Sequence, residues 1–160
     1  MLNRAHLTDN RLNLIDLSHH ATKVNILAAT IPETLHDLFQ KPFICALSTV
    51  NASGQPHTVP VWVDFDGTHV RVNAPAATKK AKDMAQNSKV AVMIIDPAQP
   101  YHWIEVRGHI AEIRDESNGA REHINGLSLK YTGNPVYPGF GNSNIDRLMY
   151  LIEPDKVNGQ

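Results

Sequence analysis

Polar and apolar residues alternate through most of the chain from residue 43 onward, which is the pattern of β-strands with one buried face. In the segment 57–65, every second residue from Val59 to Phe65 is valine or phenylalanine, and the residues between them are polar or mixed. The pattern predicts six strands, which cover residues 43–50, 57–65, 68–73, 89–96, 101–114 and 147–153.

Helical spacing replaces the alternation in three places. The first helix begins at Thr30, where a Thr-Ile-Pro-Glu sequence is typical of a helix start, and it ends before Pro42. The second is expected over residues 78–87, with Ala81, Met84 and Ala85 as its buried stripe, and the third over residues 116–131.

The order of the elements favours antiparallel pairing. Asp66-Gly67 is a hairpin signal, and strands do not alternate with long helices as they do in parallel sheets. We therefore expect a mainly β fold of the α+β class, a six-stranded antiparallel split β-barrel with Greek-key connections and short flanking helices. Residues 31–160 form this domain, and residues 1–30 are predicted to be an N-terminal arm or extension.

Pro60 stands inside a predicted strand, although proline has no N–H to donate to a neighbouring strand. One interpretation places it in an edge strand at a gap in the barrel. The other is a strand whose outer face is covered by a flat ligand rather than by another strand.

Cations gather at the start of the second helix, where Thr78 is a candidate N-cap and Lys79, Lys80 and Lys82 follow. Because a helix N-terminus is already positive, each lysine there costs a few tenths of a kcal/mol, roughly. Backbone N–H groups, a hydroxyl and ammonium groups at one point suit a phosphate. The alternative is a solvated face on which Lys79 pairs with Asp83 at i,i+4.

Composition narrows the classes of function. The 160 residues carry a net charge of −1, which disfavours a nucleic-acid-binding protein. The longest apolar run, Val90 to Ile95, is too short to cross a membrane, and no secretory signal is visible, so no membrane partner is expected. The single cysteine, Cys45, is expected to be buried and inert, and its lack of a disulfide partner is typical of a cytoplasmic protein.

Several kinds of site are not expected. The chain has neither a Walker loop nor a dinucleotide-binding fingerprint. Nine histidines are present, but no spacing typical of zinc ligands occurs and the adjacent His19 and His20 point apart on any regular element, so no metal site is predicted.

The succession of motifs resembles the pyridoxamine-5′-phosphate-oxidase-like flavin-binding split barrels, especially their small flavin or deazaflavin reductase branch. The matching text is PETLHDLFQKPFICALSTVNASGQPHTVPVWVDFDG, VRVNAPAATKKAKDMAQNSKVAVMI, YHWIEVRGHIAEI and DRLMYLIEPDKV. The resemblance implies a homodimer with two equivalent sites for FMN, or alternatively coenzyme F420, at the interface.

The resemblance also implies where the cofactor contacts fall. The phosphate is expected against the lysine helix, at Thr78, Lys79, Lys80 and Lys82. The ring is expected along Val59, Pro60, Val61, Trp62, Asn73 and Ala74. The second subunit is expected to contribute Tyr101, Trp103 and, as a further candidate, Arg107.

The function implied is that of an oxidoreductase acting on a small organic substrate through its bound flavin. Arg71 is a candidate for a positive group near the ring, and His57 and His69 are candidate proton donors, although no catalytic residue is assigned. The loop 133–144, which carries Tyr137, is either a lid over the ring or a plain connector.

Alternative functions remain open on the residues alone. A non-catalytic flavin carrier needs no further groups, whereas a haem-handling protein needs an axial ligand from His57, His69, His102 or His109. The tail after Asp146 lacks the Arg- and His-containing substrate motif of true pyridoxamine-phosphate oxidases, so vitamin B6 oxidation is not expected.

Overall fold

A computed structural model describes residues 28–139 and 146–160, so most of the predicted N-terminal arm and part of the predicted lid loop lie outside the described residues. The helical elements are η1 (Glu33–Leu35), α1 (Asp37–Gln40), α2 (Lys79–Gln86), η2 (Glu116–Asn118) and α3 (Ala120–Thr132). The strands are β1 (Cys45–Val50), β2 (Pro56–Val61), β3 (Val63–Phe65), β4 (Val70–Pro75), β5 (Lys89–Asp96), β6 (Gln99–Arg114) and β7 (Arg147–Gly159).

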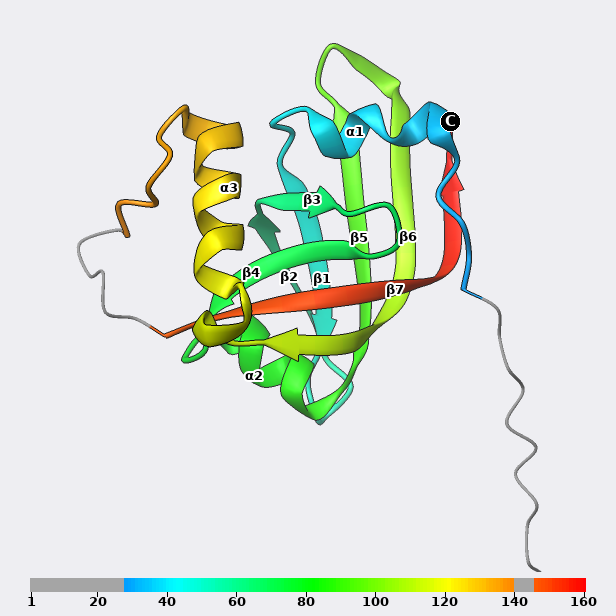
Figure 1. Ribbon diagram of the computed structural model, residues 1–160. Coiled ribbons are helices and arrows are strands. Elements are labelled where there is room, and N and C mark those ends of the chain that lie inside the picture. Colours follow the sequence, from blue (N-terminus) through cyan, green and yellow to red (C-terminus); the bar gives the residue numbers. More distant parts are fainter. Residues whose placement is uncertain (1–27, 140–145) are drawn as a thin grey trace, which may run out of the picture.

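The strands form one antiparallel sheet in the order β2-β1-β5-β6-β7-β4-β3. The two ends of this order, β2 and β3, are consecutive in the chain and are separated only by Trp62. The sheet therefore curls until one continuous segment links its first and last strands (Figure 1). This confirms the mainly β, antiparallel split barrel. It also confirms Pro60 in an edge strand, because within the described part of the chain β2 pairs with β1 alone.

The prediction of six strands was wrong by one. The segment 57–65 is two strands, because its first half pairs with β1 and its second half pairs with β4, and Trp62 belongs to neither ladder. The predicted helix 116–131 is likewise divided, since Gly119 has a positive φ of 99° between η2 and α3. Such a backbone conformation suits glycine and interrupts a helix.

Other boundaries also differ from the prediction. The expected first helix is a 3-10 turn followed by one α-helical turn, and the last strand runs on to Gly159 because β7 continues along β6. Gly108 of the VRG sequence has a packing role, since a Cβ there would lie 2.2 Å from the carbonyl oxygen of Glu153 on β7. Only glycine allows the two strands this approach.

The core fills the inside of the curled sheet. The inward residues of the strands are valine, leucine and isoleucine that are completely or almost completely buried, such as Leu47, Val72 and Ile104. Helix α2 adds Ala81 and Met84 to this cluster, but Ala85, which was predicted to share its buried stripe, is exposed. The buried stripe of α2 therefore ends at Met84 rather than at Ala85.

Helix α3 stands beside the β3 and β4 end of the sheet (Figure 1). Lys130 Nζ donates hydrogen bonds to the carbonyl oxygens of Phe39 and Val63. The hydroxyl of Tyr131 donates to the carbonyl of Phe43 at 2.7 Å and accepts from the N–H of Val63 at 3.2 Å. Burial lowers the pKa of Lys130 to about 8. These bonds fix α3 at the split in the barrel, next to Trp62.

Among residues 28–139 and 146–160, no helix has the length and apolar character needed to cross a membrane.

Candidate functional site

A cleft of about 330 Å³ opens where the chain passes from β2 to β3, between α3 on one side and the start of α2 on the other. Its lining residues are Pro60, Val61, Trp62, Asn73, Pro75, Thr78, Lys80, Ile124, Leu127, Tyr137 and Arg147. The structure therefore brings together six of the residues predicted from sequence, from three separate elements. They are Pro60, Val61, Trp62, Asn73, Thr78 and Lys80.

One wall of the cleft is aromatic and apolar. The Trp62 ring stacks on the Tyr131 ring with centroids 5.0 Å apart and an interplanar angle of 9°, and Tyr137 meets Trp62 edge-on at 5.9 Å. Ile124 and Leu127 of α3 are buried beside them. Such a surface suits a flat aromatic ligand, because it offers area without competing polar groups.

Two cations, Lys80 and Arg147, line the same cleft. Burial and the neighbouring Arg147 charge lower the pKa of Lys80, and burial also lowers the pKa of Arg147. In the part of the chain that the structure describes, Lys80 has no carboxylate partner, and the Arg147 guanidinium donates to the neutral amide of Asn73 instead. Two facing cations of this kind favour an anion between them.

Thr78 holds the expected N-cap position, but its hydroxyl does not cap the helix. It donates to the carbonyl oxygen of Pro75 at 2.8 Å, and no side chain of the described residues caps α2. The first N–H groups of a helix have no partner within the helix. They are therefore available to an anion held by Lys80.

The other predicted phosphate ligands lie elsewhere. Lys79 Nζ pairs with Asp83 at 2.9 and 3.0 Å, which is the i,i+4 alternative considered from the sequence. Asp83 is buried and also accepts from Thr49 at 3.1 Å. Lys82 is exposed and does not line the cleft. The three lysines therefore do not converge, and only Lys80 faces the cleft.

Asn73 and Arg147 form the floor of the cleft. Asn73 lies on the outer face of β4, but α3 covers it and it is only 7% exposed. Its amide oxygen accepts from Arg147 Nε at 2.6 Å. Sequence reasoning missed Arg147 because its place depends on the pairing of Pro75 with Arg147 between β4 and β7, which are distant in the chain.

The remaining predicted ring contacts do not line this cleft. Ala74 is completely buried in the core, and Val59 lines a separate groove on the outside of β1 and β2. Arg71, a candidate for a charge near the ring, is committed to Asp64 through two hydrogen bonds of 2.9 and 2.8 Å.

The candidate proton donors also face away from the cleft. His57 Nδ1 lies 3.4 Å from Asp83, and His69 Nδ1 lies 3.8 Å from Asp66. No histidine lines the cleft in the described residues, so the four histidines considered as haem ligands find no support there. Nor is any group of three or more His, Cys, Asp and Glu side chains placed to hold a metal within residues 28–139 and 146–160.

Tyr101 and Trp103 lie on another surface. Trp103 faces Ile95 across the β5–β6 ladder, and both belong to an outer sheet face on which Ile44 and Met93 are also exposed. An apolar groove of about 320 Å³ crosses this face. We call it the outer groove; its lining residues are Ile44, Cys45, Ala46, Thr58, Val59, Pro60, Met93 and Ile95. Pro60 belongs to both the outer groove and the cleft.

The donor set of the cleft fits a phosphate-bearing aromatic cofactor. Lys80 and Arg147 supply charge-assisted donors, Thr78 and the start of α2 lie beside them, and Trp62 with Tyr137 forms the apolar wall. Arginine and lysine together are suited to a phosphate. The fold and the cleft together define a split barrel with a side cleft lined by two cations and an aromatic wall.

Comparison with known proteins gives the family. The family model for pyridoxamine 5′-phosphate oxidase matches residues 31–160, and the chain belongs to this family. No curated protein matches the chain.

Solved structures include several with the same fold. An F420 reductase is 28% identical, with a TM-score of 0.70, and the match covers 81% of this chain and 100% of that one. A conserved hypothetical protein of Mycobacterium tuberculosis is 19% identical, with a TM-score of 0.63, and covers 81% and 84%. The haem storage protein HutZ of Vibrio cholerae is 14% identical, with a TM-score of 0.62, and covers 82% and 95%.

Proposed function

We propose that this protein is an oxidoreductase that binds a flavin-type cofactor with a ribityl phosphate, FMN or coenzyme F420, in the cleft and acts on a small organic substrate. The observation that carries the proposal is the pair of cations Lys80 and Arg147, which face one cleft while Lys80 has no carboxylate partner in the described residues. The phosphate of the cofactor is the anion that suits them.

The proposal assigns distinct tasks to the walls of the cleft. Lys80, Arg147 and the start of α2 bind the phosphate. Trp62 and Pro60 lie along the ring and exclude water from one side of it. A bound flavin or deazaflavin supplies the hydride chemistry itself, so the protein contributes position, electrostatics and access.

Two cofactors remain in the proposal because both carry a ribityl phosphate. The similarity to an F420 reductase, at 28% identity over the whole of that chain, favours the deazaflavin. The longer acidic tail of F420 would extend from the phosphate toward further cations, and exposed Lys82 on α2 is available to it. The similarity to HutZ, at 14% identity, supports the fold alone.

We further propose that the active form is a homodimer in which the partner covers the open side of the cofactor. A volume of about 330 Å³ is at the small end for ligand pockets, which span roughly 300–1,000 Å³. The outer groove adjoins the cleft at Pro60, and Ile44 and Ile95 on its face are 53% and 44% exposed. A second copy seated there would bury this apolar surface beside the ring.

The direct test is to titrate the purified protein separately with FMN and with F420 and to follow cofactor fluorescence. Saturable binding of one of them, with stoichiometry of one per chain, is expected. Turnover of an organic acceptor with the reduced cofactor then separates an enzyme from a carrier. Failure of both cofactors to bind would contradict the proposal.

A further inference from the structure

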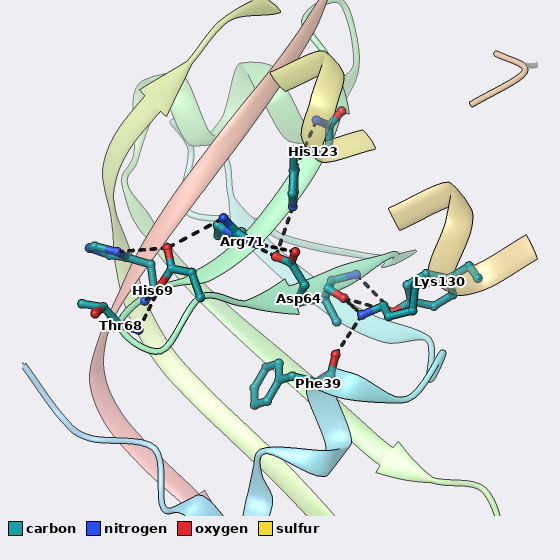
Figure 2. A network of polar contacts seen from close by, with 11 residues as sticks. Phe39, Asp64, Thr68, His69, Arg71, His123 and Lys130 are labelled. Carbon is teal, nitrogen blue, oxygen red and sulfur yellow. Dashed lines mark hydrogen bonds and ion pairs between the residues drawn. The ribbon is translucent and has the colours of Figure 1, made fainter. Parts of the chain in front are cut away.

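A continuous chain of hydrogen bonds runs from the floor of the cleft to the ion pair between Asp64 of β3 and Arg71 of β4, on the same face of β4 as Asn73. Arg147 Nε donates to Asn73 Oδ1 at 2.6 Å, Asn73 Nδ2 lies 3.4 Å from His123 Nδ1, and His123 Nε2 lies 3.1 Å from Asp64 Oδ1. Figure 2 shows His123 reaching down from α3 to Asp64, while Arg71 reaches the same carboxylate from β4.

Arg147 and Asp64, the two ends of this series of hydrogen bonds, fix which groups donate and which accept. Arginine can only donate, so the Asn73 oxygen faces Arg147 and its NH₂ group faces the other way. That NH₂ group also donates to the carbonyl oxygen of Ala120 at 2.9 Å, in agreement with this orientation. His123 Nδ1 must then accept, and the proton of the ring is on Nε2, where it is donated to Asp64.

We propose that Asn73 and His123 are positioning residues of the cleft, which hold Arg147 toward the bound phosphate while His123 is neutral and release it when His123 is protonated. The inference rests on the proposed function, because it assumes that the ligand of the cleft is a phosphate-bearing cofactor. It adds a residue outside the cleft, since His123 does not line it.

Protonation of His123 would place two hydrogen-bond donors, its own Nδ1–H and the NH₂ group of Asn73, opposite each other. A second proton would be on Nδ1, and that N–H would point at the NH₂ group of Asn73. If the Asn73 amide turned over to present its oxygen to His123, its NH₂ group would face Arg147, which also can only donate. In either orientation at least one contact is lost, and the turned-over amide would also lose its hydrogen bond to the Ala120 carbonyl. Both Asn73 and His123 are too deeply buried, at 7% and 8% exposed, for water to replace these contacts freely.

Charged groups surround the imidazole of His123 from several elements. Burial opposes ionisation of Asp64 on β3, but hydrogen bonds from the imidazole and from Arg71 on β4 outweigh burial and lower the Asp64 pKa to about 2. Lys130 on α3 lies within electrostatic range of the same carboxylate. Arg147 on β7 faces the imidazole through Asn73, and Glu116 of η2 accepts from the Arg147 backbone N–H at 3.1 Å. The arginines stay charged throughout the range in which histidine titrates.

We call the hydrogen-bonded chain Arg147–Asn73–His123–Asp64 the relay. The first test examines the relay in the absence of any ligand. In ¹⁵N-labelled full-length protein at about pH 8, long-range ¹⁵N–¹H correlation of the histidine rings should show His123 protonated on Nε2 only. On acidification, exchange of the Arg147 Nε proton with water should accelerate together with protonation of His123. A ring protonated on Nδ1 at about pH 8, or an Arg147 proton indifferent to the titration, would overturn the relay.

The second test measures FMN affinity in wild type and in His123→Gln. Glutamine can accept from Asn73 and donate to Asp64, but it does not take up a proton. The two proteins should bind FMN about equally at about pH 8, and the variant should bind about fivefold or more tightly than wild type at about pH 5.5. Because the FMN phosphate titrates in both proteins, its own protonation cancels in this ratio.

His109→Gln is the matched control, since His109 contacts Asp155 at 2.9 Å and does not line the cleft. Its affinity ratio to wild type should not change with pH. Equal pH dependence of wild type and His123→Gln would overturn the relay while leaving the cofactor site intact. If neither FMN nor F420 bound at any pH, the proposed function would fail, and the relay would be decided by the ring and arginine signals alone.

Discussion

Substitution of Lys80 by methionine tests whether the Lys80 ammonium group, rather than that of a neighbouring lysine, binds the phosphate. Methionine keeps the length and apolar stem of lysine and removes only the ammonium group. Because Lys80 lines the cleft with Arg147 and has no carboxylate partner in the described residues, its charge is free for a ligand. Lys79→Met is the matched control, since Lys79 is one residue away but holds Asp83 at 2.9 Å.

The expected loss follows from the kind of bond removed. A hydrogen bond to a charged group contributes about 1.5–3 kcal/mol, which corresponds to about a 10- to 150-fold change in Kd. Lys80 is half-buried, so solvent screening reduces the effect toward about tenfold. Lys79→Met should change the Kd by less than about threefold, because a charge held by Asp83 and exposed to solvent is screened.

The thermal stability of the ligand-free protein should not fall in Lys80→Met, although its cofactor affinity should. The ammonium group of Lys80 faces the guanidinium of Arg147 in the free protein, so its removal relieves a repulsion. The melting temperature of ligand-free Lys80→Met should therefore be at least that of wild type. Fluorescence titration with the cofactor and thermal unfolding without it measure the two quantities. Unchanged affinity in Lys80→Met, or a larger loss in Lys79→Met, would refute the assignment of the phosphate site.

Three further outcomes follow from the structure. Ile95→Lys should convert the proposed dimer to monomer in sedimentation velocity. Leu129→Lys is the control, because Leu129 is also exposed, at 55%, and this variant should remain dimeric. A dimeric Ile95→Lys variant would contradict the proposed interface. When protonated, His102 donates from both ring nitrogens, to Asp37 and to the carbonyl oxygen of Gln160, and the hydrogen bond to Asp37 raises the His102 pKa above its ordinary 6.5. The charge-dependent part of its contribution to stability is therefore present below that ordinary value and is lost as pH rises through the raised pKa. His102→Phe should lower the free energy of unfolding more at about pH 6 than at about pH 9, and an equal loss at both would count against this. Burial raises the pKa of Cys45 to about 12, so its thiol should react with a disulfide reagent at about pH 8 only after unfolding in urea; rapid reaction of the native protein would disprove its burial.

Much of the barrel could be predicted because its strands alternate strongly. The bounds of β5 were predicted without error, since its continuous apolar run has a charged residue at each end. The break at Trp62 was missed because the alternation continues through it. Only the change of partner, from β1 for β2 to β4 for β3, reveals that the segment is two strands.

The site was predicted in part for a similar reason. Local signals, such as a proline in a strand and lysines at a helix start, identified Pro60 and Lys80. The sequence could not decide which lysine faces the cleft, because the Lys79–Asp83 pair depends on side-chain direction around α2. Arg147 was beyond reach, since β7 joins β4 only through the closure of the whole sheet.

The central claim is that Lys80 and Arg147 together hold the phosphate of a flavin-type cofactor. A crystal structure of the protein grown with FMN or F420 tests it most directly. The account predicts phosphate oxygens within hydrogen-bond distance of both Lys80 Nζ and the Arg147 guanidinium, with the ring against Trp62. A cofactor bound elsewhere, with both cations directed into solvent, would contradict it.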